Sequence, residues 1–236
     1  MNKTKTIVFF VLFCFAAPLF LNAHFTWIVP AEKEKCILIG HGHSFPQSEH
    51  ALALEGLQVI LLDSRGKSHS AQPEKREKEV AAKLPADLEE LAAAIFQQEA
   101  VIITRTTSGV KRGAMNTHSG VIDSFRRLRS AYFQSAPGVE LPVIADRLLL
   151  QAENRDGKMY FSLRLGPQSL AGIPVKMVAS GQDEGREIGK TDSTGRIFFK
   201  PEKAGLYLFS ADYSPEVKHD EYLREQYAAT LAVLIE

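Results

Sequence analysis

Residues 159–165 read Met-Tyr-Phe-Ser-Leu-Arg-Leu. Apolar side chains alternate with more polar ones along this stretch, a pattern that predicts a β-strand with one buried face. Working outward, short apolar segments recur about every ten residues through 141–236, with turn residues such as those at 191–195 between them. We therefore expect residues 141–236 to form a C-terminal β-sandwich of the Ig-like or prealbumin-like type.

The region before residue 120 has the same rhythm. Residues 25–29 alternate and are followed by Pro30, residues 36–39 form a short apolar run, and residues 57–62 form another. These segments predict an N-terminal β-rich lobe over residues 24–120. The fold class expected is therefore mainly β, with two β-sandwich lobes.

Two other segments have helix-like spacing. Between the lobes, apolar residues at 125, 128, 132 and 133 recur on one helical stripe, with arginines at 126, 127 and 129 on the remaining surface. This spacing predicts a short helical connector over residues 121–140 whose arginines form a solvated face. Residues 84–95 fit either a helix or a loop before the next strand.

The composition excludes several classes of protein. Basic and acidic residues both number 28, so the formal net charge is zero, and the lack of a basic surplus argues against a nucleic-acid partner. Two cysteines cannot form a disulfide scaffold. The sequence has no P-loop, no glycine-rich dinucleotide motif and no G-x-S-x-G motif. We expect a non-enzymatic protein without an organic cofactor.

The first 23 residues have the pattern of an export signal. Lys3 and Lys5 precede an almost wholly apolar run over residues 7–21, and Ala23 offers a small residue at the cleavage position. We expect a signal peptide, residues 1–23, to be cleaved after Ala23 and the mature chain to be periplasmic; the alternative is an uncleaved N-terminal anchor. Cys36 is then the only thiol of the mature chain, and we expect it either buried in a strand or near a metal.

Histidines supply the candidate site. His41 and His43 lie in Gly40-His41-Gly42-His43, and in an extended strand residues i and i+2 project from the same face. Two neutral imidazoles on one face can chelate a borderline transition metal, and the glycines leave room for a partner. A mature chain that begins at His24 adds an α-amine and a third imidazole, and pairing of the first two strands would bring these within reach. We therefore predict that His24, His41 and His43 bind a metal.

Other residues are weaker candidates. His50 and Glu49 follow in the same segment and could add a ligand or accept a hydrogen bond from one. His118 and His219 are distant in sequence and could join the site only if the fold returns them to it. His69 lies among lysine and serine residues and is expected at the surface.

The chain resembles a family of bacterial periplasmic proteins, a domain of unknown function related to the accessory components of nickel and cobalt uptake. The resemblance rests on AHFTW at 23–27 and GHGHSFP at 40–46 and, near the other end, on TDSTGR at 191–196, GLY at 205–207 and the apolar run 227–235. It implies an exported, non-enzymatic protein that works with membrane metal-transporter components.

Three functions stand as hypotheses. The first is an exported metal-binding protein that assists uptake of nickel or cobalt through a membrane transporter. The second is a non-catalytic β-sandwich interaction module whose histidines are incidental. The third is a copper-binding protein with an N-terminal histidine site. The expected cofactor is Ni²⁺ or Co²⁺, with Cu²⁺ and Zn²⁺ as alternatives that imidazole also binds.

Overall fold

The structure is a computed structural model that describes residues 24–156, 158–182 and 185–235. The expected signal peptide, residues 1–23, lies outside the described residues. Within them the chain forms seventeen strands and two single-turn helices, η1 (Glu32–Glu34) and η2 (Met115–Thr117). The mainly β class predicted from the sequence is confirmed. None of the described helices has the length and apolar character needed to span a membrane.

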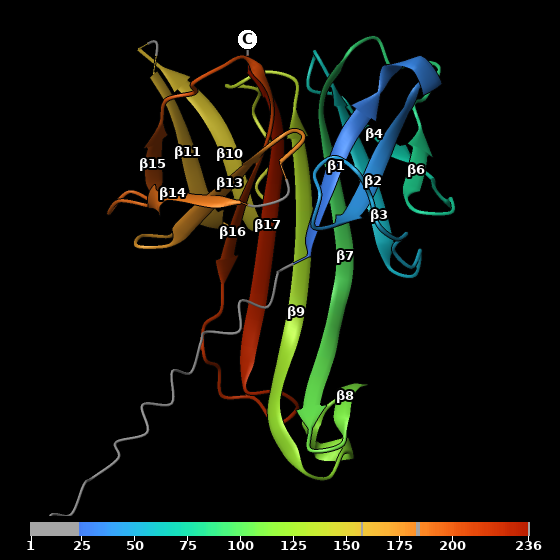
Figure 1. The fold of residues 1–236 in the computed structure, drawn as a ribbon, viewed down its shortest axis with the longest axis vertical. Helices are drawn as coiled ribbons and strands as arrows, with labels where there is room; N and C mark the ends of the chain where they lie inside the picture. Colours follow the sequence, from blue (N-terminus) through green and yellow to red (C-terminus); the bar gives the residue numbers. More distant parts are fainter. Residues whose placement is uncertain (1–23, 157, 183–184, 236) are drawn as a thin grey trace, which may run out of the picture.

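A nine-stranded sheet forms the centre of the molecule (Figure 1). Its strands run in the order β14, β13, β16, β17, β9, β7, β3 and β4, with β8 added to β7. Strand β17 runs parallel to β9, whereas the other neighbours in this sheet are antiparallel. The bounds are β3 (Leu57–Asp63), β4 (Ser68–Ala71), β7 (Leu91–Thr106), β8 (Gly109–Arg112), β9 (Val121–Gln134), β13 (Pro174–Ala179), β14 (Arg186–Lys190), β16 (Gly205–Tyr213) and β17 (Arg224–Ile235).

Two four-stranded sheets complete the fold. The first, which we call the β1 sheet, contains β1 (Phe25–Ala31), β2 (Cys36–Gly42), β6 (Val80–Lys83) and β5 (Pro73–Lys75). The second, the β10 sheet, contains β10 (Leu148–Arg155), β11 (Lys158–Leu165), β12 (Gln168–Ser169) and β15 (Arg196–Phe199). In Figure 1 the blue strands β1 and β2 lie beside β7 and β9, and the β10 sheet lies near β13 and β16.

The central sheet is buried on both faces along its middle. On β7, Ala93 and Ile95 belong to the core shared with the β10 sheet, whereas Ala94 and Phe96 belong to the core shared with the β1 sheet. Successive side chains of a strand point to opposite faces of its sheet. The β1 sheet and the β10 sheet therefore cover opposite faces of the central sheet, which makes three layers.

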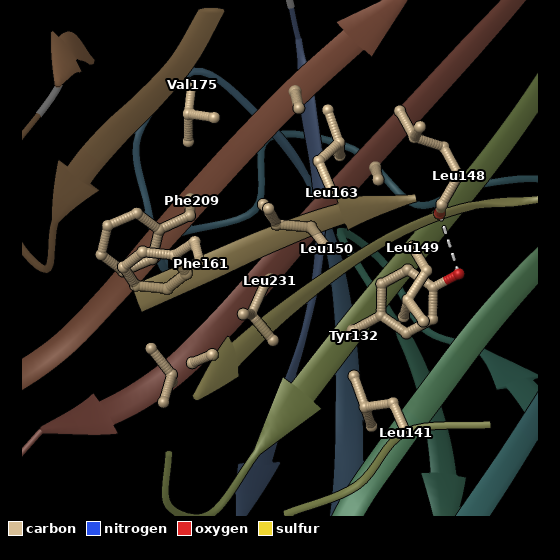
Figure 2. Close-up of a cluster of buried hydrophobic side chains, with 14 of the residues drawn as sticks. Tyr132, Leu141, Leu148, Leu149, Leu150, Phe161, Leu163, Val175, Phe209 and Leu231 are labelled. Carbon is tan, nitrogen blue, oxygen red and sulfur yellow. Dashed lines mark hydrogen bonds between the residues drawn. The ribbon is translucent and has the colours of Figure 1, made fainter. Parts of the chain in front are cut away.

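Figure 2 shows the core between the central sheet and the β10 sheet. The rings of Phe161 and Phe209 have centroids 3.9 Å apart, and the Tyr132 hydroxyl donates a 3.0 Å hydrogen bond to the carbonyl of Leu148. Each large apolar side chain that is fully buried in this way stabilises the fold by roughly 1.5–3 kcal/mol. This core fixes β9 and β17, the strands on which β1 lies.

The helical connector predicted over residues 121–140 is wrong, because residues 121–134 form strand β9. This strand pairs with β7 on one side and with β17 on the other. Both of its faces are buried over Ala131, Tyr132 and Phe133, so apolar residues occupy consecutive positions and imitate a helical stripe. Residues 84–90 are likewise non-helical, as the loop alternative stated, but residues 91–95 already belong to strand β7, so neither alternative fits that part of the segment.

The central sheet contains strands from both sides of residue 141, where the sequence predicted that the C-terminal lobe begins. Strand β9 precedes that position and pairs with β17, which follows it. Leu62 and Ile95, from the segment expected to form the N-terminal lobe, share one core with Phe209 and Leu231. The two segments expected to form separate lobes therefore contribute to one central sheet and to the core between it and the β10 sheet.

Candidate metal centre

The pairing of β1 with β2 places the first two histidines of the candidate site together. Thr26 lies opposite His41 and Phe25 opposite Gly42, so the next residue back along the first strand, His24, reaches His43. The imidazole centroids of His24 and His43 are 4.1 Å apart, and those of His24 and His41 are 5.2 Å apart. The two neighbouring strands therefore pair as the sequence predicted.

The loop after β2 returns two more side chains to the same place. The Glu49 amide donates to the His41 carbonyl at 3.0 Å, and the His43 amide donates to Glu49 Oε1 at 2.7 Å. Ser48 fastens this loop, because its hydroxyl accepts from the His41 amide at 2.9 Å and donates to the Lys78 carbonyl at 2.7 Å. The His50 ring is thereby held 4.9 Å from the His41 ring.

The two glycines of the motif are required by close neighbours within the chain. A Cβ atom on Gly40 would lie 2.2 Å from Nε1 of Trp27, whose indole is buried. A Cβ atom on Gly42 would lie 2.8 Å from Cγ of Glu49. The space that the sequence suggested for an external partner is thus filled by Trp27 and Glu49.

The side chains form two overlapping groups of donors. We call His24, His41 and His50 the inner donor group, and His24, His43 and Glu49 the outer donor group; in each, one ligand atom per residue lies within 4.8 Å of the others. Two nitrogens bound to one ion at ~2.1 Å can lie at most ~4.2 Å apart. Small side-chain rotations would therefore close either group on one ion. Both groups could hold a metal ion, and His24 belongs to both.

His41 is the buried member of the cluster. Its side chain is only 5% exposed, and its Nδ1 lies 2.9 Å from Oγ1 of Thr26. The Thr26 carbonyl in turn accepts a hydrogen bond from the hydroxyl of Thr230. In the tautomer where Nδ1–H donates to Thr26, Nε2 keeps a lone pair for a metal, and such a second contact fixes the orientation of a ligand ring.

Burial and neighbouring charges set the protonation states of the cluster. Burial, followed by the positive charge of Arg129, lowers the pKa of His41 to about 3. Burial and the neighbouring His43 also lower the pKa of His24. The hydrogen bond from the His43 amide lowers the pKa of Glu49. At neutral pH His24 and His41 are therefore neutral and Glu49 is ionised, as a metal ion requires of its ligands.

The remaining histidines lie elsewhere. His118 is 3.3 Å from the Arg112 carbonyl through Nε2, and His219 stacks on the ring of Tyr222. Among the described residues, neither belongs to a group of donors that could hold a metal. The expectation that His69 lies at the surface is wrong, because it is buried and its Nε2 is 3.1 Å from Oδ2 of Asp63.

Cys36 is buried at the start of β2, as one of the two expectations for it stated. Its sulfur is 3.7 Å from Nη2 of Arg76 and 3.9 Å from Oε2 of Glu34. It belongs to neither donor group within the part of the chain that the structure describes. The thiol is therefore a packing group beside an ion pair.

Sequence reasoning missed Arg129. The residue was expected on the solvated face of a helix, but it is half-buried on β9 and lines a hollow together with His24, Phe25 and Thr26. The position of Arg129 beside the cluster follows only from the packing of β9 beneath β1. The local sequence around Arg129 has helix-like spacing and gives no sign of it. A cation thus lies beside the histidine cluster.

Comparison with known proteins adds no homologue: no family model matches the chain, and no curated protein is similar to it in sequence. The function is accordingly inferred from the geometry and chemistry of the histidine cluster.

Proposed function

We propose that this chain is an exported protein that binds one divalent transition-metal ion at the histidine cluster and passes it to membrane metal-transporter components. Its role is binding and transfer of the ion, without catalysis. The observation that carries this proposal is the meeting of four imidazoles and one carboxylate around His24. A chance surface histidine has no reason to share its donors with three others.

The donor chemistry supports a borderline metal. Imidazole nitrogen suits Ni²⁺, Co²⁺, Cu²⁺ and Zn²⁺, whereas Mg²⁺ and Ca²⁺ prefer sites made of oxygen atoms. Ni²⁺ or Co²⁺ is the cargo we propose, in line with the family resemblance of residues 23–27 and 40–46. Copper would bind more tightly than either in a test tube, because divalent affinities rise along the series to Cu²⁺.

The unequal burial of the donors suits a protein that releases its ion. His41 is buried and held by Thr26, whereas His24, His50 and Glu49 are exposed. One buried ligand with exposed partners on the solvent side allows a competing donor to approach the ion and replace ligands one at a time. A closed structural metal site would be slow to exchange.

We further propose that export exposes the α-amine of His24. Residues 1–23 have the composition of a cleaved signal peptide. Cleavage after Ala23 would give His24 an amine and an imidazole, which can close a chelate on one ion within a single residue. The donor groups described above would then gain one nitrogen without any change of fold.

The layered sheets also fit the sandwich architecture proposed from the sequence. The β1 sheet and the β10 sheet each enclose a core against the central sheet. We propose that these two pairs of sheets are the β-sandwiches that the strand rhythm indicated, joined through the strands β9 and β17 rather than through a helix.

Titration calorimetry with Ni²⁺ on the mature chain beginning at His24 tests the proposal. His24→Ala should abolish measurable binding, because His24 belongs to both donor groups. A loss of at least about tenfold in His41→Ala and His50→Ala would assign the ion to the inner donor group, and the same loss in His43→Ala would assign it to the outer one. His219→Ala, outside both groups, is the matched control.

A second arm tests the amine. One extra residue placed before His24 keeps every side chain and removes the α-amine from the site. We expect weaker binding in this variant. Equal affinity in the wild type and in the His24, His41 and His43 variants would refute the metal function and leave the interaction module with incidental histidines.

A further inference from the structure

Among the described residues, the β1 sheet covers only part of its face of the central sheet. Strand β1 begins at Phe25, whereas β7 and β9 continue past this point toward β8 (Figure 1). Ala131 and Phe133 on β9 pack in the core under the β1 sheet. Because side chains alternate along a strand, Arg129, Arg127 and Phe125 occupy the same face beyond the end of that core.

This face is rich in arginine. Guanidinium groups from three strands surround the Phe125 ring: those of Arg105, Arg127 and Arg224 lie 5.7, 5.0 and 5.1 Å from its centroid. Burial, followed by the positive charge of Arg129, lowers the pKa of Arg127 to about 10. Like charges are gathered here in a confined space.

The arginines of this face are only partly compensated. Arg224 forms an ion pair with Asp123 at 2.6 Å, while Arg127 donates to the neutral amide oxygen of Gln226 at 2.9 Å. Among the described residues, no ion pair or side-chain hydrogen bond involves Arg129, although the carboxylate of Asp212 lines the same hollow. Charge-assisted hydrogen bonds from Arg127 and Arg129 are therefore available to an anion.

Arg129 connects this face to the metal centre. It lines one hollow with His24, and a second hollow with Arg127 and Arg112, bordered by Leu52 in the loop that carries His50. A divalent ion held by neutral imidazoles would thus lie near the guanidinium of Arg129, whose charge the neighbouring Asp212 carboxylate offsets only in part. The repulsion falls when an anion binds between them, and the ion also needs ligands for the positions that the protein leaves open.

We propose that the metal binds together with a small polycarboxylate, one carboxylate of which completes the coordination of the ion while another pairs with Arg129 and Arg127. The inference rests on the proposed metal function and specifies the form in which the metal is carried. Guanidinium forks match carboxylates in a bidentate geometry, which explains arginine rather than lysine at these positions. A single acetate could satisfy only one of the two partners.

Calorimetric titration of Ni²⁺ into the mature chain, with and without tricarballylate, tests this inference. In the wild type the tricarboxylate should tighten the apparent dissociation constant for Ni²⁺ about tenfold, the effect of one charged hydrogen bond retained on binding. Acetate at equal carboxylate concentration should have no such effect. In Arg129→Gln and Arg127→Gln the gain should fall below about twofold, while Ni²⁺ alone still binds.

Controls separate this inference from effects on folding. Arg164→Gln, an exposed arginine on β11, should keep the full gain. Arg129→Lys keeps the charge but lacks the fork, and we expect it to lose most of the gain with an unchanged circular dichroism spectrum. Native mass spectrometry should show the wild type carrying one nickel and one tricarballylate.

The outcomes are distinct. An undiminished tricarballylate effect in both Arg129→Gln and Arg127→Gln would overturn the inference and leave the metal function in place. Equal enhancement by inorganic phosphate would overturn the assignment to a polycarboxylate. Failure of Ni²⁺ to bind the wild type under any condition would overturn the proposed function itself.

Discussion

The protonation of His41 should make the metal-free protein lose stability in acid, and His41→Gln should remove this effect. The pKa of His41 is about 3 in the folded chain because the ring is buried, against a reference value of 6.5. Below pH 6.5 the unfolded chain therefore binds a proton that the folded chain does not. The free energy of unfolding then falls by ~1.36 kcal/mol for each pH unit.

The size of the effect follows from the two pKa values. Between pH 6.5 and pH 5 the His41 contribution amounts to ~2 kcal/mol, and by pH 3 to ~5 kcal/mol. The sign of the pH dependence follows from the direction of the pKa shift. Because the pKa of His41 is lower in the folded chain than in the unfolded chain, its contribution to stability is present at high pH and is lost as the pH falls. Glutamine cannot be protonated in this range. The His41→Gln variant therefore lacks this pH-dependent contribution to the free energy of unfolding, whatever its stability at pH 7.5.

Urea unfolding of the chelator-treated protein at pH 7.5, 6 and 5 measures the effect. The quantity to compare is the drop in unfolding free energy from pH 7.5 to pH 5, in which other titrating groups cancel between variants. We expect the drop to be smaller by ~2 kcal/mol in His41→Gln than in the wild type and unchanged in the exposed-site control His219→Gln. Equal drops in wild type and His41→Gln would refute the buried, neutral state of His41.

Three further predictions concern packing and ligand orientation. Gly40→Ala would place a Cβ 2.2 Å from the indole of Trp27 and should cost about 1–3 kcal/mol, measured by urea unfolding followed through the single tryptophan; an unchanged midpoint would contradict this contact. Leu231→Asp puts a carboxylate where the side chain is fully buried and should abolish the folded circular dichroism spectrum; a native spectrum would argue against the shared core. Thr26→Val removes the partner of His41 Nδ1 and should weaken Ni²⁺ binding about tenfold in calorimetry; full affinity would show that Thr26 does not orient the ring.

Strands with one apolar face could be predicted from the sequence, whereas the central strand β9 could not. Residues 159–165 alternate and do form β11. In β9 the apolar residues 131–133 are consecutive because two different layers cover the two faces of the strand. Burial on both faces removes the period of two, and the remaining spacing matches a helix as well as a strand. Only its pairing with β7 and β17, which are distant in sequence, decides between them.

The histidine cluster could likewise be predicted only in part from the sequence. Local pairing of two neighbouring strands brings His24 to His43, and a short connection makes that pairing foreseeable. The approach of His50 and Glu49 depends instead on Ser48, whose hydroxyl joins the loop to the His41 amide and to the Lys78 carbonyl. A hydrogen bond to a residue thirty positions away leaves no local pattern. Arg129 was not predicted because it lies on β9, whose burial on both faces gives the sequence a helix-like spacing.

Arg129 affects the metal centre in two opposite ways. Burial is the main cause of the lowered pKa values of His24 and His41, and the positive charge of Arg129 adds to it, which favours neutral rings that can bind an ion. The same charge would repel a bound metal ion. A half-buried cation beside the proposed metal site would therefore be costly for a bare ion and favourable for an ion that arrives with negative ligands. On the proposed binding of the metal together with a polycarboxylate, the affinity of the histidine cluster would depend on the anion as much as on the metal, and a change in the anion outside the protein would shift the balance between retention and release.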